Sequence, residues 1–248
     1  MLCLPAPALA ASGGSGLSPA SGMSPSSGAA PAPAPANTPV TASGNGITLT
    51  TTASALLRNA LSFTGTAPTG SGVQTVEIER LGHQTHWRWQ PTVQATINAD
   101  GSFDAVWRTN HIGRFLIRAV LGGTAASAAQ ADTAPTVATT IYRPSVATLY
   151  GPGFYGRRTA CGRRLTRSMI GVANRTLPCG STVAIDYHGR TLQVPVIDRG
   201  PYANHADWDL TMATARAIGI TGTVKLGAVS LPTPPPSAPA AAAPTSGS

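Results

Sequence analysis

The chain has 248 residues, of which only 10% are charged and 5% aromatic, and it contains 27 Gly and 22 Pro. This composition is too lean for one packed globule of that length and indicates folded modules joined by unstructured segments. The formal net charge of +8 is carried almost wholly by Arg and favours a polyanionic partner. The arginines are scattered along the chain and no nucleic-acid-binding motif accompanies them, so nucleic acid is not an expected partner.

The two ends of the chain look unstructured. Residues 1–11 are apolar and end in Ala-Leu-Ala, the small-x-small pattern that precedes a signal-peptide cleavage site. Their basic region is missing, so we interpret them as a truncated signal peptide. Residues 12–45 are rich in Ser, Gly, Ala and Pro and predict a disordered linker, and residues 232–248 predict a disordered Pro/Ala tail. No stretch is apolar for the roughly 18 residues that a membrane-spanning helix needs, so no transmembrane segment is expected.

Residues 46–143 contain short runs in which apolar and polar residues alternate. These runs lie at Ile47–Thr50, Leu61–Phe63, Val73–Arg80, Trp87–Trp89, Val93–Ile97, Phe103–Trp107 and Phe115–Val120. Several short strands at near-regular spacing predict an immunoglobulin-like β-sandwich. We interpret Trp87, Trp89 and Trp107 as core residues, with a sugar-stacking platform as the alternative.

Residues 144–231 predict a small β-rich barrel with one short helix. Its strands are expected at Ser145–Tyr150, Ser181–Asp186, Thr191–Ile197 and Gly222–Val229. The tetrapeptide Tyr187–Arg190 has the Gly of a hairpin turn. The helix is expected to run from Met212 to Ile218, with Thr211 as its N-cap and Gly219 as its C-cap.

Asp198 is the first candidate for a functional side chain. Leu192, Val194 and Val196 share one parity of an apolar strand, and Asp198 falls on the same parity just before a Gly-Pro turn. Side chains alternate between the two faces of a strand, so Asp198 is expected at the end of the buried row. A partly desolvated carboxyl group suits acid or base work. The alternative is a structural Asp that opens the turn by bonding its own backbone.

Cys161 and Cys179 form an isolated pair late in the chain. No His lies near them at a zinc-like spacing, so no metal site is expected. In a chain with a signal-like start, such a pair favours a disulfide; two reduced core cysteines are the alternative.

A series of motifs in residues 144–231 is more specific. In chain order they are ATLYGPGFYG (Ala147–Gly156), RTACG (Arg158–Gly162), RTLPCG (Arg175–Gly180), VIDRGP (Val196–Pro201) and WDLT (Trp208–Thr211). This series resembles the rare lipoprotein A (RlpA) family. The resemblance implies a six-stranded double-psi β-barrel related to that of expansins, and therefore an all-β chain. The paired Cys161 and Cys179 look like the secreted actinobacterial branch of the family, which implies that they are disulfide-bonded.

The resemblance also implies a chemistry. Active RlpA proteins are lytic transglycosylases that cleave peptidoglycan without water and leave an anhydro-muramyl end. One carboxyl group can protonate the glycosidic oxygen and then take the 6-hydroxyl proton. The family's central carboxylate corresponds to Asp198. This chain departs from the family where Glu and His are common, because it has Arg163 and Asn174 at those positions.

Further site residues are expected around Asp198. Asp209 supports catalysis or, alternatively, bonds the first amides of the helix. Arg199 pairs with a substrate carboxylate or phosphate, or clamps the neighbouring loop. Four aromatic residues are expected to stack on sugar rings or to pack the loops: Tyr150, Phe154, Tyr155 and Tyr202.

Three functions remain open from the sequence. The first is a secreted RlpA-type lytic transglycosylase, and the second is a non-catalytic, expansin-like module that binds or loosens wall polysaccharide. The third is an inhibitor or signalling protein built on a stable barrel, since a fold does not fix a function. The expected partner is peptidoglycan or an anionic cell-wall polysaccharide, the expected location is secreted or in the cell wall, and a monomer without cofactor is expected.

Overall fold

The computed structural model describes residues 38–70, 72, 74–122, 133–202 and 205–233. The predicted signal peptide, most of the predicted linker and nearly all of the predicted tail lie outside these ranges. Within the predicted linker range 12–45, however, Pro39–Gly44 forms strand β1. Val40 and Ala42 of this strand pack against the core of the first module, which explains why a spacer-like sequence is ordered there.

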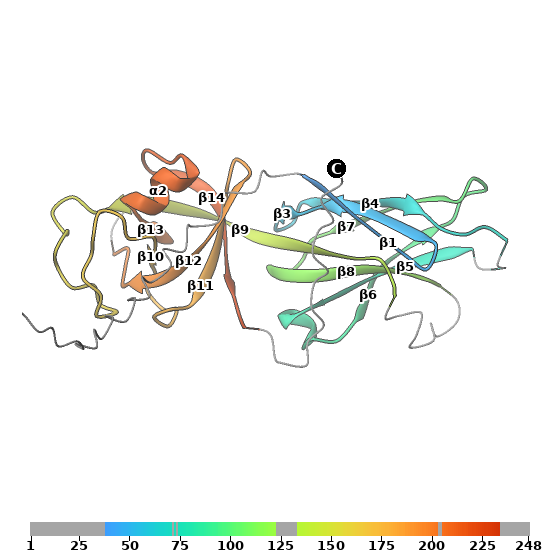
Figure 1. Cartoon of the computed structure of the whole chain (residues 1–248), viewed down its shortest axis with the longest axis horizontal. Coiled ribbons are helices and arrows are strands. Elements are labelled where there is room, and N and C mark those ends of the chain that lie inside the picture. The colour runs from blue at the N-terminus through green and yellow to red at the C-terminus, as the bar shows by residue number, and fades with distance from the viewer. Residues whose placement is uncertain (1–37, 71, 73, 123–132, 203–204, 234–248) are drawn as a thin grey trace, which may run out of the picture. The chain divides into compact units, whose positions relative to one another are not determined.

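The first module consists of two β-sheets (Figure 1). One sheet has the order β1–β2–β4–β7, in which the last three strands are Ile47–Thr52, Ala60–Thr66 and Ser102–Arg108. The other contains β6 (Gln90–Thr96), β5 (Thr75–Gly82), β8 (Gly113–Leu121) and the first half of β9 (Thr136–Tyr150), beside which lies β3 (Ser54–Leu56). Side chains of both sheets share one hydrophobic cluster. The immunoglobulin-like character of this module stays a prediction.

The predicted strand at Trp87–Trp89 is wrong. The segment follows a short 3-10 helix, η1 (His83–Thr85), and begins in a turn. His86 and Trp87 have φ values of 52° and 58°, which lie in the left-handed region and do not fit an extended strand. The interpretation of the tryptophans as core residues holds for Trp107, which is buried edge-to-face against Phe115.

The second module is a closed barrel of six strands, which confirms the expected architecture. Its order is β13–β10–β12–β11–β14–β9, and parallel pairing of β13 with β9 closes it (Figure 1, yellow to red). The strands are the second half of β9, β10 (Val172–Ala173), β11 (Thr182–Tyr187), β12 (Arg190–Asp198), β13 (Trp208–Thr211) and β14 (Val224–Leu231). Strand β9 pairs with β3 up to Tyr142 and with β14 from Arg143 onward, so its partners change near the expected module boundary.

The barrel interior follows the predicted alternation along β12. Leu192, Val194 and Val196 are each at most 4% exposed and belong to one apolar cluster. Such burial contributes roughly 1.5–3 kcal/mol for each large side chain. The β11–β12 hairpin turns at His188 and Gly189, both with positive φ, as a two-residue type I′ turn requires.

Helix α2 (Met212–Ile218) has the predicted bounds and caps. The Thr211 hydroxyl accepts a hydrogen bond from the Thr214 amide at 3.1 Å, and Gly219 ends the helix with φ 79°. Ala215 and Ile218 belong to the barrel core. No helix within the described ranges is long and apolar enough to span a membrane.

Candidate active site

Two carboxyl groups flank one short strand of the barrel. Asp198 is the last residue of β12, and in the register of the sheet it lies beside Ala173 of β10. Asp209 of β13 lies beside Ala173 on the other side. Neighbouring strands are about 4.8 Å apart, so the backbones that carry the two carboxyl groups are roughly 10 Å apart. Parallel pairing of β10 with β12 thus brings together two acids that are separated in sequence.

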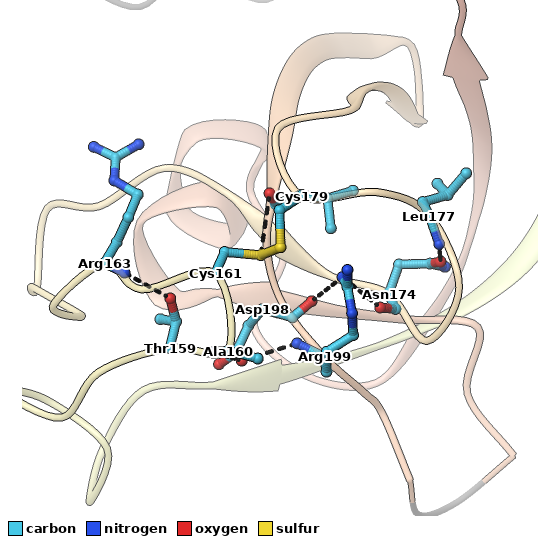
Figure 2. Close-up of a disulfide and its surroundings, with 10 residues drawn as sticks. Thr159, Ala160, Cys161, Arg163, Asn174, Leu177, Cys179, Asp198 and Arg199 are labelled. Carbon is cyan, nitrogen blue, oxygen red and sulfur yellow. Dashed lines mark hydrogen bonds between the residues drawn. A yellow bond between two sulfur atoms is a disulfide. The ribbon is translucent and has the colours of Figure 1, made fainter.

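The Asp198 carboxyl group is held by one of its two oxygens (Figure 2). Its Oδ1 accepts hydrogen bonds from the backbone amides of Ala160 and Arg199, each at 2.8 Å. Its Oδ2 has no hydrogen-bond partner in the part of the chain that the structure describes. The side chain is half-buried. The carboxyl group is therefore fixed in orientation and keeps one oxygen for an external ligand.

Asp209 is half-buried and accepts a hydrogen bond at Oδ1 from the Thr148 hydroxyl at 2.9 Å. Burial raises the pKa of this carboxyl group above its ordinary value, and the charge of Asp198 raises it further. The alternative role expected from the sequence, bonding the first amides of the helix, is wrong, because Thr211 provides that cap. Asp209 belongs to the same electrostatic site as Asp198.

Tyr150 is the third member of this site. It ends β9 and lies opposite Thr211 of β13. Its hydroxyl oxygen is buried and has no hydrogen-bond partner among the described residues. Burial, followed by the charges of Asp198 and Asp209, raises the pKa of this phenol, so it stays protonated at neutral pH and can donate a hydrogen bond.

Comparison with known proteins gives this arrangement a context. Residues 145–231 match a family model described as lytic transglycolase. A probable endolytic peptidoglycan transglycosylase RlpA of Synechocystis sp. is 44% identical over 77 residues, which cover 30% of this chain and 24% of that protein. The endolytic peptidoglycan transglycosylase RlpA of Campylobacter jejuni is 33% identical over 75 residues, covering 29% of this chain and 27% of that protein. Residues 145–231 form an RlpA-like double-psi β-barrel domain.

The likeness is confined to the barrel. The chain spans about a quarter of the length of these two relatives. Among solved structures, the Streptomyces papain inhibitor is similar at 26% identity with a TM-score of 0.30, over 36% of this chain and 93% of that protein.

The side chains of Asn174 and Arg199 are hydrogen-bonded to backbone groups of the RlpA-like domain. The Asn174 side-chain oxygen accepts hydrogen bonds from the amides of Thr176 and Leu177, at 3.1 and 2.9 Å. Arg199 donates through one guanidinium nitrogen to the carbonyl oxygens of Asn174 and Asp198, both at 3.5 Å (Figure 2). These contacts fit the clamp interpretation of Arg199 and give Asn174 a turn-forming role.

The other expected site residues lie nearer the surface. Arg163 is exposed, and Figure 2 shows its side chain extending away from Asp198. Phe154 is 53% exposed and packs edge-to-face with Tyr150, their ring centroids 6.4 Å apart. Tyr155 is half-buried beside the guanidinium of Arg167, and Tyr202 is 80% exposed.

In the described ranges, no group of three or more His, Cys, Asp or Glu side chains is placed to hold a metal ion.

The structure confirms a disulfide between Cys161 and Cys179, with the Cα atoms 5.6 Å apart (Figure 2). Cys161 directly follows Ala160, whose amide binds Asp198. The disulfide therefore ties the loop that orients the Asp198 carboxyl group to the segment before β11.

We expect the double substitution Cys161→Ser/Cys179→Ser to lower the free energy of unfolding by about 3 kcal/mol, because the bond closes a loop 18 residues long. Denaturant titration of the two proteins measures this loss. Equal midpoints, with an unchanged slope, would contradict the prediction.

The raised pKa of Asp209 implies that the stability of the fold depends on pH. A carboxyl group with a folded-state pKa above its unfolded value destabilises the fold as pH rises through the window between the two values. Asp209→Asn keeps an acceptor for Thr148 and removes the charge. We expect Asp209→Asn to unfold at a higher midpoint than the native protein at pH 7. At pH 3 we expect equal midpoints, because the native Asp209 is then protonated and both side chains are uncharged. A midpoint below that of the native protein at pH 7 would contradict this.

Proposed function

We propose that the RlpA-like domain is a peptidoglycan lytic transglycosylase in which Asp198 is the acid and base. The observation that carries the proposal is the asymmetric binding of Asp198, with Oδ1 held by two backbone amides and Oδ2 without a partner in the described ranges. The similarity to RlpA transglycosylases supports it. The expected secretion to the cell wall is part of the same proposal.

In this mechanism the protonated Asp198 gives its proton to the glycosidic oxygen as the bond between that oxygen and the muramyl C1 breaks. The resulting carboxylate then takes the proton of the muramyl 6-hydroxyl as the 6-oxygen bonds to C1. Atoms balance without water, and the carboxyl group returns to its starting state. Tyr150 contributes a hydrogen bond from its hydroxyl to a sugar oxygen held near Asp198 and Asp209. Because this hydroxyl is buried in the free protein, the contact requires that glycan binding moves the ring or the loop that covers it.

A second candidate is a wall-binding module without glycan cleavage. The specific observation in its favour is Asn174, which stands where the family commonly has His and whose oxygen is used in a turn. Arg163, where Glu is common, points away from Asp198. Neither residue can act as an acid near neutral pH.

Digestion of purified peptidoglycan by the full chain, followed by mass spectrometry, separates the two candidates. Anhydro-muramyl products establish the transglycosylase. Co-sedimentation with the wall in the absence of such products establishes the binding module. Products with a hydrated reducing end would show a hydrolase and contradict the proposed mechanism.

A further inference from the structure

One short hairpin beside the carboxylate site gathers four arginines. We call residues 156–165 the arginine hairpin; its exposed cations are Arg157, Arg158, Arg163 and Arg164. Backbone hydrogen bonds from Gly156 to Leu165 and from Thr159 to Arg163 close it, and Arg158 pairs directly with Arg164. The sequence shows two separate Arg-Arg dipeptides, and the turn between them brings these into one cationic patch.

Among the described residues, no carboxylate forms an ion pair with this patch. Residues 133–185 contain seven Arg and neither Asp nor Glu. Within the described ranges the structure has one ion pair, Arg118 with Glu79, in the other module. Like charges directly opposite each other on paired strands repel. Because no carboxylate of the described residues forms an ion pair with these arginines, a bound anion would relieve the repulsion.

Two of the guanidinium groups are braced on the hairpin itself. Arg158 donates to the carbonyl oxygen of Gly162 at 3.0 Å, and Arg164 donates to that of Gly156 at 2.7 Å. Each uses one nitrogen, and a guanidinium has five N–H donors in a planar fork. The guanidinium groups of Arg157 and Arg163 make no hydrogen bond with any described residue.

The hairpin is also fixed to the barrel. Leu165 at its base is 2% exposed, the Ala160 amide in its turn binds Asp198, and Cys161 is disulfide-bonded to Cys179 (Figure 2). The hairpin backbone and the braced Arg158 and Arg164 are therefore preformed, and a preformed surface loses little conformational freedom when it binds. The same turn thus contributes the Ala160 amide to Asp198 and carries the arginines on its exposed side, with the Arg163 side chain extending away from that carboxyl group.

We propose that the arginine hairpin is a subsite for the oxyanion groups, phosphate or carboxylate, of an anionic wall glycan whose backbone lies at Asp198. Guanidinium groups recognise both oxyanions through paired N–H donors. The inference rests on the proposed function for its substrate, and it adds that this chain selects glycan that carries negative charge on the part extending from Asp198 over the arginine hairpin.

The test compares two double variants of the full chain in co-sedimentation with purified sacculi. Arg157→Gln/Arg163→Gln removes the two cations that do not brace the hairpin. The control Arg88→Gln/Arg108→Gln removes the same charge from exposed positions of the first module. We expect the hairpin variant to bind about tenfold more weakly at low ionic strength and the control to bind as the native protein does. Salt should weaken native binding, because exposed charges are screened within about 10 Å at 0.1 M.

Two treatments of the sacculi identify the oxyanion. Hydrofluoric acid removes phosphodiester-linked polymers, and an amidase removes the stem peptides with their carboxylates. A loss of arginine-dependent binding after the first treatment assigns phosphate, and a loss after the second assigns carboxylate. Retained binding after both treatments would overturn the inference, as would equal binding by the two double variants.

Single-stranded DNA of matched charge is the third probe. If it binds the native protein as tightly as sacculi do, the hairpin is a nucleic-acid surface and the inference is wrong. Product analysis in the same samples tests the catalytic proposal and the hairpin proposal independently. Arginine-dependent binding without anhydro products contradicts the catalytic proposal alone. Anhydro products with equal binding by both variants contradict the hairpin proposal alone.

Discussion

The substitution Asp198→Asn should abolish the formation of anhydro-muramyl products, with a loss of at least about 1,000-fold in rate, while the protein stays folded. General acid–base catalysis by one side chain contributes typically 10²–10⁴-fold, and here a single group serves in both steps. The Asn oxygen can still accept the amides of Ala160 and Arg199, so the loop geometry is kept. The amide nitrogen that replaces Oδ2 can neither give up a proton at neutral pH nor accept one.

The control for this experiment is Asp207→Asn. Asp207 lies in the same barrel, is exposed, and accepts the Val146 amide at 2.8 Å, which an Asn oxygen can also accept. It removes the same charge without touching the site, so cleavage should continue. Full activity of Asp198→Asn would show that another group carries the chemistry. Equal losses in both variants would point to the net charge of the barrel instead.

Local patterns in the sequence sufficed for the elements whose structure depends on near neighbours. The caps of α2 at Thr211 and Gly219 and the turn at Gly189 each depend on a few adjacent residues, and the structure has them as predicted. Alternation along β12 placed Asp198 at the end of a buried row for the same reason. At Trp87 the same alternation gave a wrong strand, because the positive φ values of a turn override a short polar–apolar pattern.

The composition of the site depends on pairing between distant strands, which no local pattern contains. Asp198 and Asp209 come together only because the two-residue strand β10 lies between β12 and β13. The amide of Ala160 reaches Asp198 across 38 residues of sequence. The motif RTACG marks this loop as special, but its backbone contact with the carboxyl group could not be predicted from the residue types.

Tyr150 illustrates the same limit in a different way. From the sequence, its ring is expected to stack on sugar rings or to pack the loops. The ring is half-buried and packs against Phe154, while the hydroxyl oxygen is buried near two carboxyl groups without a partner in the described ranges. The chemically distinctive part of this residue is therefore its hydroxyl group. A buried donor without a partner lowers the stability of the fold.

We accordingly expect Tyr150→Phe to lower the rate of glycan cleavage about tenfold or more and to leave the free energy of unfolding unchanged or higher. Removing a buried hydroxyl that lacks a partner loses no hydrogen bond of the folded protein, whereas it removes the proposed donor to the sugar. Chemical denaturation and the product assay, performed on the same preparation, measure the two effects.

Tyr142→Phe is the matched comparison, because Tyr142 lies on the same strand and is buried, and the Thr140 side chain near its hydroxyl lowers the pKa that burial raises. Because the Tyr142 hydroxyl is not among the buried atoms without a partner, that variant should lose up to about 1 kcal/mol of stability and keep its activity. If Tyr150→Phe loses activity but not stability, and Tyr142→Phe loses stability but not activity, the Tyr150 hydroxyl serves to bind the ligand. If Tyr150→Phe instead loses stability and cleaves glycan at the native rate, its hydroxyl is structural, and the carboxyl groups must bind the sugar without it.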